Sequence, residues 1–250
     1  MLRSYKVHLK KSNRKINISV YEPKFKDNMK CLYLLDGQNA FKDTKTIFNR
    51  SLRLISIINY LSTLNINIMA IGIESDQKRN DEYSPFKIKN TAILKGGFND
   101  ISYNHNFSDD VIESIIPFIE NKYNIKPDSN NRIIYGSSLA AIESLYLGLN
   151  YDAFNNIGLF STASFIYDNE FNNFILSTIN VNKKVFIYVG SHEKSDNEFM
   201  PIDYLNAAND LKMLLDSKNI KNKLVINKIG RHNEKSWSYF IPDFLKYVFE

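Results

Sequence analysis

The stretch NRIIYGSSLAAIESLY, residues 131–146, decides the fold of this chain. Residues 132–135 are a short apolar run that ends at a glycine, which predicts a buried strand. Apolar residues at helical spacing over residues 139–149 predict a helix directly afterwards. Between them lies GSSLA, residues 136–140, in which small residues flank Ser138. Small flanks are what a sharp strand-to-helix turn requires, because the strand and the helix approach closely there.

Ser138 has two interpretations. On a sharp turn its hydroxyl points outward beside a helix N-terminus, where free N–H groups and the helix dipole favour a developing negative charge. That is the arrangement of a nucleophilic serine. Alternatively, Ser138 is an ordinary N-cap whose side chain accepts a backbone hydrogen bond. Short motifs of this kind also occur by chance, so the rest of the chain has to decide between the two.

The composition predicts one globular domain over residues 1–250. Apolar residues make up 44% and charged residues 24%, which is typical of a globular protein. The formal net charge is +5, but the lysines are scattered and no nucleic-acid-binding motif is present. The charge therefore indicates a solvated surface, and we expect no nucleic-acid partner. Nothing in the sequence indicates the oligomeric state.

The single cysteine and the absence of long apolar runs bound the chemistry and the location. Cys31 lies within an apolar run, so we expect a small buried side chain rather than a nucleophile. The N-terminus shows no secretory signal and no run of about 18 apolar residues indicates a membrane span, so we expect a cytoplasmic protein. The spacing of histidine and cysteine indicates no metal site, and no organic cofactor is expected.

Apolar patterning predicts strands that alternate with helices. Strands are predicted over residues 5–9, 15–21, 31–35, 68–73, 132–135, 157–160, 185–189 and 223–229. Helices are predicted over residues 47–61, 107–123, 139–149, 201–216 and 236–249, with a short lid or helix over 171–179. Such alternation predicts an α/β fold with a mostly parallel sheet and helices on both faces.

The segment over residues 74–106 is long, polar and without a regular pattern. A loop of this length in a compact domain is usually functional or mobile. In the helix predicted to follow it, Ser108 is a plausible N-cap and Pro117 predicts a kink.

A serine hydrolase on an α/β sheet needs a histidine base late in the chain. His232 follows the strand predicted over residues 223–229 and fits this place. Of the other histidines, His8 lies in an N-terminal strand and His105 precedes the GSSLA stretch. His192 lies where the acid of the triad is expected. We therefore expect His232 to be the base.

The orienting acid should follow the strand over residues 185–189. Glu193 and Asp196 both lie there, and we prefer Glu193 because it is nearer the strand end, with Asp196 as the alternative. The oxyanion hole needs two backbone N–H groups, one from the residue after the nucleophile and one from the loop after the third strand. These are the N–H groups of Leu139 and Gln38. We expect the neighbouring Asp36 to brace the loop rather than to take part in chemistry.

Several segments together resemble the putative esterase family, which includes enterochelin esterases, esterase D, feruloyl esterases and mycolyltransferases. The segments are LYLLDGQNAF (32–41), DEYSP (81–85), YGSSL (135–139) and GRHNE (230–234), followed by Trp237. They occur in family order, and the closest likeness is to the shorter enterochelin-esterase-like bacterial members. The resemblance implies an α/β-hydrolase fold and acyl transfer to water, with Ser138, a carboxylate near Glu193, and His232 as the triad.

The sequence departs from the family at two places. The family often has two glycines after Ser-x, where this chain has Ala140 and Ala141, which are small enough for the turn. The segment around Glu193 matches only loosely.

We therefore expect a serine carboxylic ester hydrolase that acts through an acyl-serine on a small-molecule ester, with a siderophore-type ester as one candidate. The alternatives are an acyltransferase with the same triad and a non-catalytic binding module on a hydrolase fold. The absence of a visible secretion signal disfavours the first alternative. The presence of Ser138, an acid and His232 in the required order disfavours the second.

Overall fold

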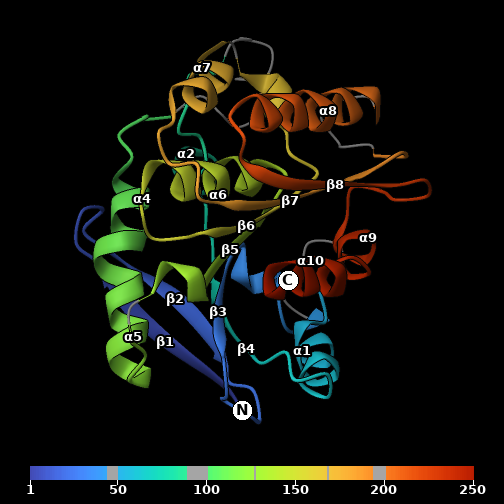
Figure 1. The fold of residues 1–250 in the computed structure, drawn as a ribbon. Helices are drawn as coiled ribbons and strands as arrows, with labels where there is room; N and C mark the ends of the chain where they lie inside the picture. Colours follow the sequence, from blue (N-terminus) through green and yellow to red (C-terminus); the bar gives the residue numbers. More distant parts are fainter. Residues whose placement is uncertain (44–49, 89–100, 127, 168, 194–200) are drawn as a thin grey trace.

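The computed structural model describes residues 1–43, 50–88, 101–126, 128–167, 169–193 and 201–250, and its centre is an eight-stranded sheet (Figure 1). The strands are β1 (Leu2–Leu9), β2 (Arg14–Tyr21), β3 (Lys30–Leu35), β4 (Ile68–Ile73), β5 (Arg132–Ser137), β6 (Asn156–Phe160), β7 (Lys184–Gly190) and β8 (Lys221–Asn227). Their order across the sheet is β1-β2-β4-β3-β5-β6-β7-β8. Every strand predicted from the sequence is present.

The sheet is mostly parallel, as the sequence predicts. Neighbouring strands are parallel from β4 through β3, β5, β6 and β7 to β8. Only β1 and β2 break this pattern, because β1 pairs with β2 and β2 with β4 in antiparallel register. The loops that follow β3, β5, β7 and β8 therefore leave the sheet at the same edge, which is where ligands bind in open α/β sheets.

Helices cover both faces of the sheet. They are α1 (Leu54–Ser62), α2 (Arg79–Glu82), α4 (Asn106–Asp110), α5 (Ile116–Tyr123), α6 (Leu139–Asn150), α7 (Asn169–Ser177), α8 (Pro201–Ser217), α9 (Glu234–Ser238) and α10 (Ile241–Phe249). One apolar core lies between the sheet and α4 to α8, and a second lies between the sheet and α1 and α10 (Figure 1). The chain therefore has the α/β-hydrolase architecture of a covered, largely parallel sheet.

Strand β3 contributes side chains to both cores. Cys31, Tyr33 and Leu35 contribute to the first core, whereas Leu32 and Leu34 contribute to the second. This alternation is the two-residue period of a strand, and it explains why the run is apolar throughout. Cys31 is buried as predicted, and burial raises the pKa of its thiol to about 12.

Two predicted helices have different limits in the structure. The helix predicted over residues 47–61 begins only at Leu54, and residues 47–49 lie outside the described part of the chain. Arg53 has a φ of 53°, a left-handed conformation that a helix does not continue through. The helix predicted over residues 236–249 is divided into α9 and α10. Pro242 lies in the first turn of α10, the one place in a helix where a missing N–H costs nothing.

The helix predicted over residues 107–123 is also divided. A π-helical turn, Val111–Ile115, separates α4 from α5, and Pro117 lies in the first turn of α5. The predicted N-cap is wrong: Ser108 is buried inside α4, where its hydroxyl donates to Glu143 Oε1 at 2.7 Å. Ser108 thus contributes to the contact between α4 and α6. His105 is the N-cap residue of α4, with a φ of 56°.

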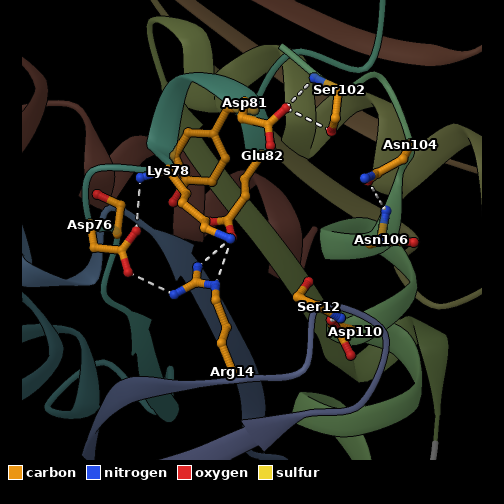
Figure 2. Close-up of polar contacts among 12 residues, drawn as sticks. Ser12, Arg14, Asp76, Lys78, Asp81, Glu82, Ser102, Asn104, Asn106 and Asp110 are labelled. Atoms are coloured by element: carbon orange, nitrogen blue, oxygen red, sulfur yellow. Dashed lines mark hydrogen bonds and ion pairs between the residues drawn. The ribbon is translucent and has the colours of Figure 1, made fainter. Parts of the chain in front are cut away.

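The polar segment over residues 74–106, predicted as a loop, contains helix α2, and charged and polar contacts hold it to the rest of the structure (Figure 2). The guanidinium of Arg14 on β2 donates to Asp76 at 2.7 Å and pairs with Glu82. Asp81 accepts a hydrogen bond from the hydroxyl of Ser102 at 2.8 Å. Burial outweighs the ion pair at Glu82 and raises the pKa of its carboxyl to about 7. Residues 89–100 of this segment lie outside the described residues.

Candidate active site

Ser138 lies on the turn between β5 and α6 in a conformation that few residues adopt. Its φ is 58° and its ψ is −123°, and its N–H donates to the carbonyl of Phe160 at 2.8 Å. Such backbone strain is concentrated at functional sites. Ser138 occupies the N-cap position of α6, but its side chain makes no capping hydrogen bond. The N-cap interpretation therefore does not account for the hydroxyl of Ser138, a residue that is partly exposed.

The turn requires small residues on both sides of Ser138. A Cβ added to Gly136 would lie 2.1 Å from the carbonyl oxygen of Ala140, closer than any real contact. Ala140 and Ala141 are fully buried against the strand. The alanines that replace the glycines common in the family are thus compatible with the observed crossing of β5 and α6.

Glu193 and His232 come together at the ends of β7 and β8. His232 Nδ1 lies 2.7 Å from Glu193 Oε2, and the Glu193 side chain has no exposed surface. Glu193 Oε1 accepts the N–H of Gly190 at 2.7 Å and the hydroxyl of Ser161. Trp237 Nε1 in turn donates to the Ser161 oxygen at 2.8 Å. Both carboxylate oxygens therefore have partners that fix their positions.

The hydrogen bond to Glu193 sets the chemistry of the imidazole. An ionised carboxylate only accepts, so His232 Nδ1 is the protonated nitrogen and Nε2 is left as an acceptor. The ring lies against Tyr204 and Trp237, with ring centroids 4.8 and 5.2 Å away. Asp196, the alternative acid, lies outside the described residues.

Ser138 is connected to this pair through the end of β6. Its N–H binds the carbonyl of Phe160, and the next residue, Ser161, binds Glu193 through its hydroxyl. Among the described residues no hydrogen bond joins Ser138 directly to His232. The structure therefore brings Glu193 and His232 into contact and links Ser138 to them through two consecutive residues.

The loop after β3 holds the expected oxyanion residue Gln38. Leu34 on β3 pairs with Tyr135 on β5, so the loops that follow these strands are neighbours. The Gln38 amide is engaged with Ser75, with hydrogen bonds of 2.7 and 2.9 Å. Within the described residues, neither the backbone N–H of Gln38 nor that of Leu139 donates to an acceptor. Two main-chain donors are thus left unused at adjacent loops.

The structure agrees with the expectation that Asp36 braces this loop. Its carboxylate accepts Arg79 at 2.7 to 3.0 Å and the Ser75 hydroxyl at 2.7 Å. A contact not predicted from the sequence ties the same loop to the histidine loop, because the amide of Asn39 donates to Glu234 Oε1 at 2.9 Å. Burial raises the pKa of the Glu234 carboxyl.

A hollow of about 690 Å³ opens beside the imidazole. The residues that line it are Arg50, His192, Pro201, Arg231, His232, Asn233, Glu234 and Lys235. A space of this size accommodates a small organic molecule.

The described residues include no cluster of three or more His, Cys, Asp or Glu side chains suited to a metal ion. In that same part of the chain, no helix has the length and apolarity needed to cross a membrane.

Comparison with known proteins gives a family and several structural neighbours. The family described as "Putative esterase" matches residues 10–249. The uncharacterized protein YbbA of Bacillus subtilis is 27% identical over 184 residues, which cover 71% of this chain and 70% of YbbA. Similar solved structures share the fold at low sequence identity.

Three of these structures span a range of lengths. The enterobactin esterase FES of Shigella flexneri has a TM-score of 0.77 at 12% identity, covering 100% of this chain but only 58% of FES. An IroE-like serine hydrolase of Shewanella oneidensis has a TM-score of 0.76 at 14% identity, with coverages of 99% and 79%. The BES protein of Bacillus cereus has a TM-score of 0.73 at 18% identity, with coverages of 99% and 94%.

Proposed function

Because the chain belongs to the putative esterase family, we propose that it is a serine carboxylic ester hydrolase that works through an acyl-serine. The observation that carries the proposal is the 2.7 Å hydrogen bond between His232 Nδ1 and the buried Glu193. This contact supports His232 as an oriented base at the sheet edge where Ser138 lies, and the described residues give the Ser138 hydroxyl no hydrogen-bond partner.

In the first half-reaction, Ser138 Oγ attacks the carbonyl carbon of the ester while His232 Nε2 takes the hydroxyl proton. The carbonyl oxygen becomes an oxyanion, which the N–H groups of Gln38 and Leu139 stabilise. When the tetrahedral intermediate collapses, the bond to the alcohol breaks and His232 gives its proton to the leaving alcohol. The acyl group remains on Ser138.

In the second half-reaction, water replaces the alcohol. His232 Nε2 takes a proton from the water as its oxygen attacks the acyl carbon, and the second intermediate expels Ser138, which recovers the proton. Throughout, Glu193 holds the imidazole by Nδ1 and stabilises its cationic form. The hydrogen bond from Ser138 to His232 is expected to form when substrate binds, since such bonds are often long in the free enzyme.

The substrate is proposed to be a small ester that fits the hollow beside His232. Structural neighbours named for enterobactin and for ferulic acid support testing a siderophore-type ester together with simple acyl esters. The same assays also test the two alternative functions, an acyltransferase and a non-catalytic binding module. An acyltransferase would pass the acyl group to an added alcohol in preference to water, and a binding module would release no product.

The test is turnover of p-nitrophenyl esters of increasing chain length and of a catecholate trilactone by wild type, Ser138→Ala and a control. Ser177→Ala is the control because Ser177 is an exposed serine at the end of α7. We expect Ser138→Ala to lose on the order of 10³-fold or more in kcat with an unchanged circular dichroism spectrum. Near-wild-type turnover by that variant would contradict the proposal.

A further inference from the structure

The hollow beside His232 has a cationic wall. Arg50, Arg231 and Lys235 all line it, and all three side chains are exposed. None of the three forms a salt bridge with a carboxylate among the described residues, although the charge of Arg50 contributes to lowering the pKa of the nearby Asp43 carboxyl. They come from two separate segments of the chain, so the fold rather than a local run of basic sequence gathers them.

One acid lines the same hollow and does not neutralise this wall. Glu234 is 2% exposed, and its Oε1 is already occupied by the amide of Asn39. Its carboxyl is also harder to ionise than usual, because burial raises its pKa. The described lining therefore carries an excess of positive charge next to the imidazole.

We propose that the ester hydrolysed at this site carries an anionic group, a carboxylate or a phosphate, which Arg231, Arg50 and Lys235 bind. The inference rests on the proposed function and specifies its substrate. Because His232 lines the same hollow, a molecule that places its anion on the cationic wall lies beside the proposed base. The planar guanidinium groups of Arg50 and Arg231 are suited to binding a carboxylate or phosphate through two hydrogen bonds.

Because the three cations are exposed, we can predict how strongly the enzyme should prefer an anionic ester and how this preference should depend on salt. Exposed charges are screened by salt within about 8 Å at physiological ionic strength. A cleft lined by one sign of charge still raises the local concentration of an oppositely charged substrate, by about 10-fold or more. We therefore expect an anionic ester to have a kcat/KM on the order of 10 times that of a neutral ester of the same shape, and the ratio to fall as salt is added.

Two pairs of esters test this on either side of the scissile bond. In the first pair, 4-acetoxybenzoate is compared with 4-acetoxybenzamide, which have nearly the same shape and differ in charge on the alcohol side, each rate being divided by that of the uncatalysed hydrolysis. In the second, the mono-4-nitrophenyl ester of adipic acid is compared with its terminal amide, which differ in the charge on the acyl side. The pair that shows the preference identifies which part of the substrate reaches the cationic wall.

Substitutions test whether the residues of the cationic wall cause the preference for an anionic ester. Arg231→Gln should reduce the anionic-to-neutral ratio of kcat/KM several-fold, mainly through KM, and Arg231→Lys should retain most of it. Lys235→Gln has Lys6→Gln as its matched control, because Lys6 is an exposed lysine on β1 at the opposite end of the sheet. Lys6→Gln should leave the ratio unchanged.

The outcomes separate this inference from the function on which it rests. Equal kcat/KM values within both pairs, with hydrolysis that still requires Ser138, would overturn the anionic substrate and leave the esterase standing. A preference unaffected by Arg231→Gln, Arg50→Gln and Lys235→Gln would overturn the assignment of the cationic wall. If none of the four esters is hydrolysed in a Ser138-dependent way, the proposed function fails and the inference fails with it.

Discussion

Glu193 contacts His232 through a carboxylate that has no exposed surface and that accepts hydrogen bonds from three groups, one of them the imidazole. Glu193→Gln keeps the size of the side chain but removes its charge, so the imidazole loses the partner that stabilises its cationic form. Removal of this charge costs about 10⁴-fold in well-studied serine proteases, and we expect a comparable loss in kcat here. Circular dichroism should show a folded variant.

Asp196→Asn is the matched comparison, because Asp196 follows the same strand. We expect it to cost far less activity than Glu193→Gln. If Asp196→Asn instead causes the large loss in kcat, the orienting acid is Asp196, three residues further along the chain. If neither substitution matters, Ser138 and His232 act without an orienting acid from this loop.

From the sequence, chain order predicted the residues of the candidate site, and it favoured Glu193 over Asp196 only because Glu193 is nearer the end of the strand. Both follow β7, and only the folded chain shows that the first contacts His232. The support from Ser161 and Trp237 was not predicted either, because it depends on side chains 32 and 76 positions from their partners. Trp237 did carry a signal, since it belongs to the segments that resemble the family.

At the level of elements, the crossing of β5 and α6 determines where Ser138 lies. Gly136→Ala would place a methyl group 2.1 Å from the Ala140 carbonyl, which is backbone and cannot rotate away. We expect this substitution to lower the free energy of unfolding by about 3 kcal/mol or to prevent folding. Urea unfolding measures the change.

Gly148→Ala, in helix α6, gives a control for the substitution at Gly136 on β5. The methyl group there would meet the flexible end of Ile157, at 2.2 Å from Cδ1, so the neighbour can rearrange. We expect a smaller loss than for Gly136→Ala. A Gly136→Ala protein as stable as wild type would show that β5 and α6 are not held as closely as the structure indicates.

The strands were more predictable than the helices for a physical reason. A buried strand such as β3 or β7 is marked by a continuous apolar run, which the sequence shows directly. Helix limits depend on single residues: Arg53 in a left-handed conformation delays α1, and Pro242 accompanies the break before α10. Ser108 resembled an N-cap until its buried partner Glu143 on α6 was known.

For the whole molecule, buried acids predict how stability changes with pH. Burial raises the pKa of Glu82 from an ordinary 4.5 to about 7, so the folded protein binds a proton that the unfolded chain has released. Stability should therefore fall as pH rises from about 4.5 to about 7, by up to roughly 3 kcal/mol from this group. Burial raises the pKa of Glu143 as well, so the ionisation of Glu143 also lowers stability as pH rises.

Urea unfolding between pH 4.5 and 7.5 tests this prediction in wild type and Glu82→Gln. The variant loses its charged contact to Arg14, so the informative quantity is the slope with pH rather than the stability at one pH. We expect a flatter slope for Glu82→Gln and the wild-type slope for Glu113→Gln, which alters an exposed acid on the π-helical turn. Identical slopes in all three proteins would show that Glu82 titrates normally.

The central claim is that Ser138 is the nucleophile of an esterase, and reaction with a fluorophosphonate probe tests it most directly. Such probes phosphonylate a serine only where a base activates its hydroxyl. Peptide mapping of the folded, labelled protein is predicted to find the phosphonate on Ser138, with labelling slowed strongly in His232→Ala. A folded protein that remains unlabelled, or that is labelled elsewhere while Ser138 stays unmodified, would contradict the account.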